Sequence, residues 1–448
     1  MLSMTTTQPI SFSPDFLFGV SNAPGQVEDK LNDIWQDFGR EGKLSAYQNQ
    51  DFPEERLRFW TEPEIEIDLA AELGVHVFRL GVDWERIHPS PGVFDQDALN
   101  RYLEILEMIR SRKMKVMLTL FHFSLPKWVQ KEGGWTNPLT KDHFFAFSKK
   151  VMSELNPLVD FWITFNEPQI FTTMAYTLGI FPPGKKGSLL SSLKALKEMV
   201  HSHKSIYTWA HTHLEKPIIG IAQHMGYHSG KTPVNKFISG FTGEFMNWYF
   251  PKRIKGHLDY FGFNYYGAEW IAGASISIDE EEEFSEAGRA IYPRGLYLIS
   301  KEIKKRFPEL PQFITENGVS DATDLIRPNY LIQHLKVVAA LTTENINILG
   351  YIHWTLSDNL EWSDGYGPKF GLVAVDRKKN LTRIKRSSFF LYQKIIQEKV
   401  ISSETQDSCW ARLQSHVGEP RPFWRADDGK TGLNEAKERL IRPIDWRF

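Results

Sequence analysis

Cysteine is nearly absent from this chain of 448 residues, which contains Cys409 alone. One cysteine cannot form an internal disulfide, and this composition is typical of a reducing compartment. An excess of charge is also absent, because 53 Lys and Arg residues stand against 55 Asp and Glu residues, for a net charge of −2. This balance argues against nucleic acid, or any other partner held by bulk charge.

A long apolar segment is missing from the N-terminal region. Residues 1–16 contain three consecutive threonines and no apolar run that follows basic residues. Signal peptides and membrane anchors both need such a run. We therefore expect no transmembrane segment and a cytoplasmic location.

The chain does contain enough apolar sequence for a large core, with 42% hydrophobic and 13% aromatic residues. Its length fits two or three average domains, or one barrel with loop insertions. Nothing in the sequence marks a second domain, so we expect a single domain over all 448 residues, with the barrel at about 14–400. The extension over about 401–448 contains Trp410, Trp424 and Trp446, which predicts that it packs on the barrel.

Eight apolar segments recur along the chain, and amphipathic segments of helical period separate many of them. The apolar segments span residues 16–20, 75–80, 115–122, 161–165, 218–222, 258–266, 313–316 and 348–354. The helical segments span residues 63–73, 99–112, 144–155, 201–214, 298–307 and 330–341. Near-continuous apolar strands are typical of a parallel sheet buried on both faces. The alternation predicts an α/β fold, a closed (β/α)₈ TIM barrel, with its active site at the carboxyl ends of the strands.

Two glutamates directly follow buried strands. Glu167 comes just after the fourth apolar segment and Glu316 ends the seventh, 316 − 167 = 149 residues later. In a barrel these strands lie across the mouth from each other, and a pair of carboxyls is what cleavage of a glycosidic bond requires. The alternative is a pair of surface turn acids, but both strands are too apolar for a surface position.

Other strands end in side chains that suit a sugar. Planar hydrogen-bonding groups match hydroxyls that both donate and accept, and aromatic faces match the apolar faces of a sugar ring. These residues are Gln26, His122, Tyr266, Trp354, Glu361 and Trp362. Any one of them could be an ordinary core histidine or packing tryptophan, but their shared position at strand ends favours a carbohydrate site.

Cofactor and metal sites are not indicated. The histidines of the helical segment 201–214 are not three or four residues apart, so no pair shares a helix face. Gly365 and Gly367 lack the strand, turn and helix of a nucleotide-binding loop. We expect no cofactor and no metal.

Several motifs together resemble glycoside hydrolase family 1. In chain order they are FLFGVSNAPGQVED from Phe16, FRLGVDWERIHP from Phe78, LTLFHFSLPKW from Leu118, TFNEP from Thr164, NYY from Asn264, ITENG from Ile314 and HWTLSDNLEW from His353. The resemblance extends from about Phe16 to about Tyr392 and implies a retaining β-glycosidase.

The resemblance also implies residue roles. Glu167 would be the acid/base and Glu316 the nucleophile, with a pKa of Glu167 that the charge of Glu316 raises. Arg79 and Asn264 would support the pair, and Arg79 would keep the nucleophile ionised. The glycone would be held by Gln26, His122, Asn166, Glu361 and Trp362, with Trp354 under its ring and Tyr266 bonded to the nucleophile.

Within the family, the chain is most similar to the plant sensitive-to-freezing branch, whose members transfer galactose between galactolipid head groups. FSEAGRAIYP from Phe284 and GYGPKFGLVAVDR from Gly365 carry this similarity. Two activities therefore stay open, hydrolysis of a β-glucoside or β-galactoside and transfer of the sugar to a sugar or lipid acceptor. Glu361-Trp362 matches the family pattern for an unphosphorylated sugar. Phe123 stands where most members have tryptophan, which removes an indole N–H donor.

A third hypothesis is a catalytically inactive carbohydrate-binding barrel. It predicts the loss of one carboxylate or of the glutamine, histidine and tryptophan set, and none of these is lost. The partner expected from the sequence is thus a small β-glycoside or a glycolipid head group.

Overall fold

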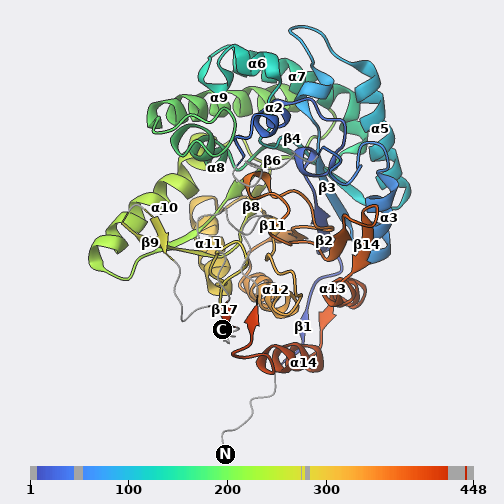
Figure 1. Ribbon diagram of the computed structural model, residues 1–448, viewed down its shortest axis with the longest axis vertical. Helices are drawn as coiled ribbons and strands as arrows, with labels where there is room; N and C mark the ends of the chain where they lie inside the picture. Colours follow the sequence, from blue (N-terminus) through green and yellow to red (C-terminus); the bar gives the residue numbers. More distant parts are fainter. Residues whose placement is uncertain (1–7, 45–53, 274, 278–282, 422–438, 441–448) are drawn as a thin grey trace, which may run out of the picture.

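A computed structural model describes residues 8–44, 54–273, 275–277, 283–421 and 439–440. Its centre is a closed barrel of parallel strands (Figure 1), in the order β11-β12-β2-β3-β4-β5-β6-β8. The strands are β2 Leu17–Ser21, β3 Val77–Gly81, β4 Lys115–Phe121, β5 Phe161–Asn166, β6 Ile219–His224, β8 Phe261–Asn264, β11 Gln312–Asn317 and β12 Ile348–His353. These eight strands confirm the predicted TIM barrel, with β12 closing on β2.

The interior of the barrel is filled by apolar side chains. Val77, Met117, Ile163, Phe313 and Ile352 come from five different barrel strands, belong to one buried cluster and have no exposed surface. Full burial of such a side chain contributes about 1.5–3 kcal/mol relative to exposure. The barrel is therefore a packed core, which leaves its carboxyl end as the place for a site.

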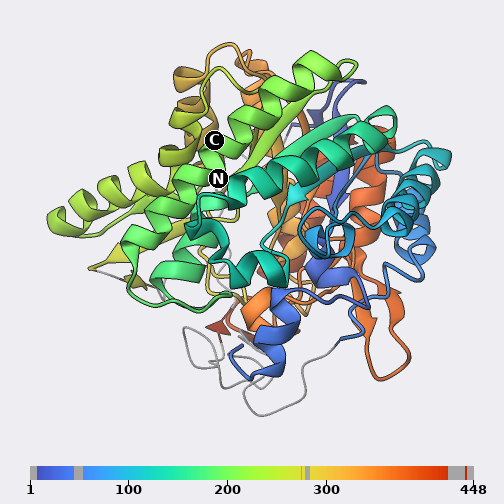
Figure 2. The ribbon, with the colours of Figure 1, turned by 90° about the horizontal axis from the view of Figure 1, so that it is seen from above.

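Helices form the outer layer around the barrel (Figures 1 and 2). They include α3 Glu64–Leu73, α5 Gln96–Ser111, α7 Thr140–Leu155, α9 Leu189–His213, α10 Pro233–Arg253, α11 Pro293–Arg306, α12 Arg327–Thr343 and α13 Ser387–Glu398. Helix α5 illustrates the local logic, because the Asp95 carboxylate caps its first turn by accepting from the Ala98 N–H, and Leu99 and Ile105 are buried. Helix α3 ends at Gly74, whose φ of 83° is left-handed.

Several helices differ from the sequence prediction, and they include α13, which was not predicted, as well as α9 and α10. Helix α9 begins at Leu189, twelve residues before the predicted start at 201. Helix α10 was not predicted, because Phe237 and Phe241 lie exposed on it and obscure the apolar period that marks a buried face.

A small sheet extends from the carboxyl end of the barrel. Strand β7 (Tyr227–Ser229) follows β6, and β9 (Ala268–Ala272) and β10 (Ser275–Ser277) follow β8. The strand order is β10-β9-β7, with β7 parallel to β9. Because these strands continue from the ends of β6 and β8, the sheet stands at the same end as the predicted site.

Shorter elements complete the described chain. They are α1 Pro24–Val27, α2 Ile34–Arg40, α4 Trp84–Ile87, α6 Lys127–Lys131, α8 Pro168–Thr172, β13 Val373–Asp376 and β14 Thr382–Lys385, with one-turn helices at 134–136, 156–158, 173–177 and 362–364. Strand β1 (Ile10–Ser11) pairs with β15 (Val400–Ile401), so both ends of the barrel segment meet.

The C-terminal extension packs on the barrel where it is described. Helix α14 (Ser403–Gln414) brings Trp410 and Leu413 into one apolar cluster with Tyr330 of α12. Short strands β16 (Pro420–Arg421) and β17 (Arg439–Leu440) pair with each other. The predicted packing of Trp424 and Trp446 concerns positions outside the described residues.

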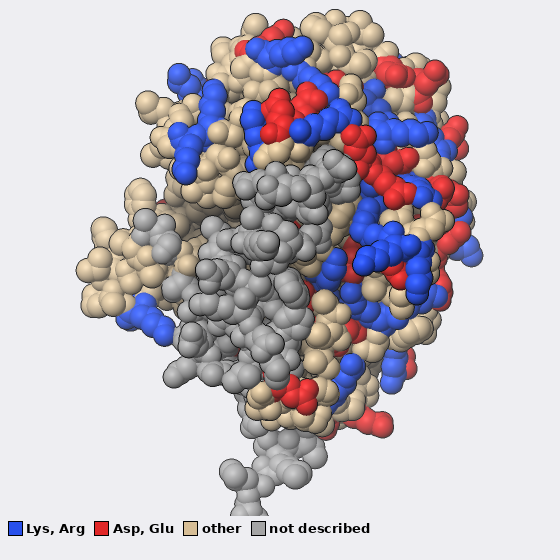
Figure 3. All heavy atoms as spheres, viewed as in Figure 1, with Lys and Arg blue, Asp and Glu red and all other residues tan. Residues whose placement is uncertain are grey.

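Two surface properties bear on possible partners. Basic and acidic side chains are interspersed on the face shown in Figure 3, so neither sign dominates its described part. Within the described ranges, no helix combines the length and the apolar character needed to cross a bilayer.

Candidate active site

A cavity of about 410 Å³ opens at the carboxyl end of the barrel. It brings together most of the residues predicted from strand ends. Those that line it are His122, Asn166, Glu167, Tyr266, Glu316, Trp354, Glu361 and Trp362. Side chains that are distant in sequence thus face one space, as a single site requires.

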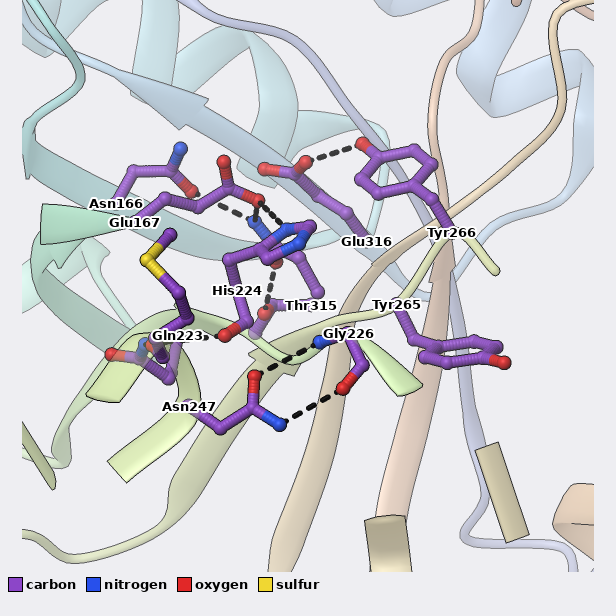
Figure 4. A network of polar contacts seen from close by, with 12 residues as sticks. Asn166, Glu167, Gln223, His224, Gly226, Asn247, Tyr265, Tyr266, Thr315 and Glu316 are labelled. Atoms are coloured by element: carbon purple, nitrogen blue, oxygen red, sulfur yellow. Dashed lines mark hydrogen bonds and ion pairs between the residues drawn. The ribbon is translucent and has the colours of Figure 1, made fainter. Parts of the chain in front are cut away.

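Glu167 lies between the end of β5 and the start of α8. Its backbone has a left-handed φ of 42°, which is uncommon for a residue with a side chain, and its N–H donates to the Ala222 carbonyl of β6 at 2.8 Å. Asn264 Nδ2 donates to Glu167 Oε1 at 2.9 Å. The turn and these bonds fix the carboxyl group, and Figure 4 shows it beside that of Glu316.

Glu316 lies near the end of β11 and is 4% exposed. Arg79 Nη1 donates to one of its oxygens, and the Tyr266 hydroxyl donates to the other at 2.5 Å. Two donors on the two oxygens suit an ionised carboxylate. This is the contact pattern that the resemblance implied for Arg79 and Tyr266.

Arg79 also connects the two glutamates through amides. Its Nη2 donates to Asn166 Oδ1 at 2.7 Å, and that oxygen also accepts from Asn264 Nδ2 at 3.1 Å. Asn264 Oδ1 in turn accepts from the Thr315 hydroxyl at 2.7 Å. The fully buried guanidinium of Arg79 on β3 is thus part of a hydrogen-bond network with side chains from three other strands, β5, β8 and β11.

We predict that Arg79→Met moves the acidic limb of the kcat/KM profile upward. The charge of Arg79 lowers the pKa of Glu316, so its removal raises that pKa by about 1–3 units, and the nucleophile becomes protonated at higher pH. Arg79→Lys, which keeps the charge, should shift the limb less. Rates measured on an aryl β-glycoside across the pH range check this, and an unmoved limb in Arg79→Met would contradict it.

His122 is a neutral hydrogen-bonding group. Burial and the charge of Arg79 hold its pKa well below the ordinary range. Asn166 Nδ2 donates to His122 Nε2 at 3.0 Å, so the proton of the neutral ring is on Nδ1. That nitrogen is buried and has no hydrogen-bond partner among the described residues.

Trp354 and Trp362 supply aromatic walls beside Glu361. Trp354 Nε1 donates to Glu361 Oε1 at 3.2 Å. Burial raises the pKa of Glu361 well above its ordinary value, and the neighbouring charges of Asp364 and Glu316 add to this. A carboxyl group in these surroundings can both donate to and accept from sugar hydroxyls.

One residue predicted to bind the sugar, Gln26, is absent from the cavity lining, whereas Phe123 is part of it. Gln26 is fully buried and does not line the cavity, because its Nε2 donates to the Leu360 carbonyl at 2.5 Å. Phe123, the departure from the family pattern, lines the cavity and packs against Trp362 with ring centroids 5.2 Å apart. The indole donor missing at this position is thus missing from the wall of the cavity itself.

Three residues that were not predicted from the sequence form a chain of contacts that begins at Glu167. His224 Nδ1 lies 3.3 Å from Glu167 Oε1 (Figure 4). His224 Nε2 lies 3.2 Å from Glu269 Oε1. His228 Nε2 lies 3.0 Å from Glu269 Oε2. The signal for His224 was present, since it directly follows the fifth apolar segment and Gln223, but no residue of that strand was selected.

The pKa of Glu167 differs from the prediction. Burial alone would raise it, but the charge of His224, the hydrogen bonds from His224 and Asn264, and the charge of Arg289 lower it below the ordinary value. Burial raises the pKa of Glu316 against the opposing charge of Arg79, and the charge of Glu167 adds to the rise. The prediction considered only the two glutamates and was wrong because it lacked His224.

The family model for glycosyl hydrolase family 1 matches residues 8–250 and 245–401 of this sequence. The chain belongs to glycosyl hydrolase family 1. It is 37% identical to the chloroplastic galactolipid galactosyltransferase SFR2 of Arabidopsis thaliana, over 97% of this chain and 82% of that protein. It is 39% identical to the chloroplastic β-glucosidase-like SFR2 of Oryza sativa subsp. japonica, over 90% of this chain and 67% of that protein.

Solved structures of family 1 members match the barrel. A β-glycosidase from Pyrococcus horikoshii superposes with a TM-score of 0.82 at 27% identity, over 89% of this chain and 98% of that chain. A hyperthermophilic β-glucosidase from Pyrococcus furiosus gives the same values. These matches confirm the family resemblance and the fold that the motifs implied.

The comparisons also correct the expected cytoplasmic location. Both plant relatives of this family 1 chain are chloroplast proteins by name. The cytoplasmic prediction rested on the single cysteine and on the composition of residues 1–16, neither of which distinguishes one intracellular compartment from another, and it was wrong.

Proposed function

We propose that this family 1 enzyme is a retaining β-glycosidase that acts by double displacement on neutral, unphosphorylated β-glucosides or β-galactosides. The observation that carries the proposal is the pair of strand-end carboxyls, Glu167 and Glu316, which face one cavity at the carboxyl end of the barrel. Retaining glycosidases hold two carboxyls about 5–5.5 Å apart, one as nucleophile and one as acid/base.

The contacts of each glutamate support its assigned role. Glu316, bonded to Arg79 and Tyr266, attacks the anomeric carbon as the bond to the leaving oxygen breaks. Glu167 gives that oxygen a proton and then takes one from the incoming hydroxyl, while the bond from the anomeric carbon to Glu316 breaks. The two inversions return the original configuration.

The sugar would be held by the remaining cavity residues. The His122 ring, the Asn166 amide and Glu361 offer polar contacts, and the Trp354 and Trp362 rings offer apolar faces. The negative charges of Asp364 and Glu316 near Glu361 disfavour a phosphate at this place, which supports an unphosphorylated sugar. No cofactor takes part in this scheme.

A second candidate function is transfer of the sugar to a sugar or lipid acceptor. The identity of 37% to a protein named as a galactolipid galactosyltransferase favours it. Both activities share the glycosyl-enzyme and differ only in the molecule whose hydroxyl Glu167 activates.

A product analysis decides between the two activities. We predict that incubation with a β-galactolipid in mixed micelles consumes the lipid through Glu316, with release of free galactose if water is the acceptor and accumulation of an oligogalactolipid if a second lipid is. Thin-layer chromatography and mass spectrometry distinguish these products. Aryl β-glucosides and β-galactosides serve as soluble controls, and a folded enzyme that cleaves neither these nor the lipid would contradict the proposed function.

A further inference from the structure

His224 stands between two carboxylates and has a proton to offer each of them. It ends β6, is 3% exposed, and directs Nδ1 toward Glu167 and Nε2 toward Glu269, at 3.3 and 3.2 Å. A neutral imidazole has one N–H and one lone pair, so it would turn a lone pair toward one of these oxygens. Only the imidazolium can donate to both, and the geometry therefore favours the charged ring.

The second carboxylate is held in place by the small sheet. Glu269 of β9 and His228 of β7 are register partners on neighbouring strands, and His228 Nε2 lies 3.0 Å from Glu269 Oε2. A Cβ at Gly226 would lie 2.9 Å from His228 and 3.2 Å from Glu269, so glycine leaves room for this pair. Asn247 fixes the Gly226 backbone through two hydrogen bonds, at 2.9 and 3.1 Å (Figure 4).

The charges around His224 determine whether the proton lies on its ring or on a neighbouring carboxyl group. Burial alone would lower the pKa of His224, but the carboxylates of Glu167 and Glu269 raise it to about 9. Glu167 also faces the Asn264 amide, the positive charge of Arg289 and the carboxyl group of Glu316. Glu269 faces His224 and His228, which hold its pKa well below the ordinary range against the effect of burial. Near neutral pH the free enzyme thus has a protonated His224 and an ionised Glu167.

We propose that His224, anchored by Glu269, is a positioning residue that holds Glu167 in its base form and so favours activation of the acceptor hydroxyl over release of the aglycone. The inference rests on the proposed function, because it concerns the balance between the two half-reactions. In the second half-reaction the ionised Glu167 takes the acceptor's proton as the acceptor oxygen bonds to the anomeric carbon and the bond to Glu316 breaks. In the first half-reaction, Glu167 must protonate the leaving oxygen, so only those enzyme molecules react in which the proton of the Glu167–His224 pair lies on Glu167.

The pH dependence of kcat/KM tests this role directly. On a 4-nitrophenyl β-glycoside, the basic limb reports loss of the single proton that Glu167 and His224 share in the free enzyme. The two carboxylates raise the pKa of His224 to about 9, whereas in His224→Asn Glu167 alone carries this proton, so the basic limb should move downward by about 1–3 pH units. Glu269→Gln weakens the hold on the His224 proton and should move the limb in the same direction by less. His213→Asn, at an exposed histidine of α9, is the matched control and should leave the limb in place.

A second substrate separates this effect from structural damage. A 2,4-dinitrophenyl β-glycoside has a leaving group that needs no proton, so its kcat/KM should stay within a factor of about two in His224→Asn. Its kcat at a pH of about 6 should fall several-fold, because less Glu167 is ionised when the acceptor must be activated. A variant that loses kcat/KM and kcat alike, or that lowers the rate at every pH with an unmoved basic limb, overturns the inference. The Glu316→Ala variant keeps the two proposals apart, since turnover without Glu316 would overturn the proposed function, whereas an unmoved limb overturns only the role of His224.

Discussion

Replacing Glu316 by alanine should lower kcat/KM for aryl β-glycosides by about four orders of magnitude or more. The variant has no group that can form the covalent intermediate, and losses of this size are typical when a nucleophile is removed. Arg79 and Tyr266 would remain and would still surround the site, so the cavity keeps its shape while the reaction stops. Initial rates with a nitrophenyl substrate measure this loss.

Azide gives that variant a distinctive second result. The space left by the Glu316 side chain admits a small anion on the face of the sugar that the carboxylate attacked. Added azide should restore turnover and yield a glycosyl azide of inverted, α configuration, which NMR identifies. Glu107→Ala, at an exposed glutamate of α5, is the matched control and should keep the wild-type rate and the retained product. Near wild-type rates in Glu316→Ala, without azide, would refute the assignment of the nucleophile.

The barrel could be predicted from the sequence because its signals are local. Each barrel strand is a short apolar run buried on both faces, and residues at its carboxyl end fall at one edge whatever their spacing in the chain. Glu167 and Glu316 are 149 residues apart, yet the rule for strand ends was enough to place them in one cavity.

The parts that escaped prediction depend on contacts between distant segments. Gln26 follows a strand end like the others, but its Nε2 donates to the Leu360 carbonyl, a partner that only the fold reveals. Glu269 is placed beside His224 by the small sheet, whose strands are too short to show an alternation of apolar and polar residues in the sequence. The predicted rise in the pKa of Glu167 was wrong for the same reason, since the charge that lowers this pKa belongs to His224 on a neighbouring strand.

Replacing Glu167 by alanine should produce a loss that depends on the leaving group. General acid catalysis contributes about 10²–10⁴-fold, and the whole of this contribution is needed when the leaving oxygen is that of an alkyl glycoside or a glycolipid. For these substrates kcat/KM should fall by about that factor. For a 2,4-dinitrophenyl glycoside kcat/KM should change little, because its leaving group departs without a proton. A plot of log(kcat/KM) against leaving-group pKa, steeper in Glu167→Ala than in the wild type, is the measurement.

In Glu167→Ala, azide should act in the second half-reaction and give a product of the opposite configuration from that in Glu316→Ala. Without Glu167 no base activates water, so the glycosyl-enzyme of the dinitrophenyl substrate accumulates and kcat falls. Azide needs no base, and it attacks from the face that Glu167 occupied, so it should restore kcat and yield a glycosyl azide of retained, β configuration. A loss of equal size for all leaving groups, or an α product, would contradict the assignment. Because the two variants predict azides of opposite configuration from the same cavity, the pair of products fixes which carboxyl acts on which face of the sugar.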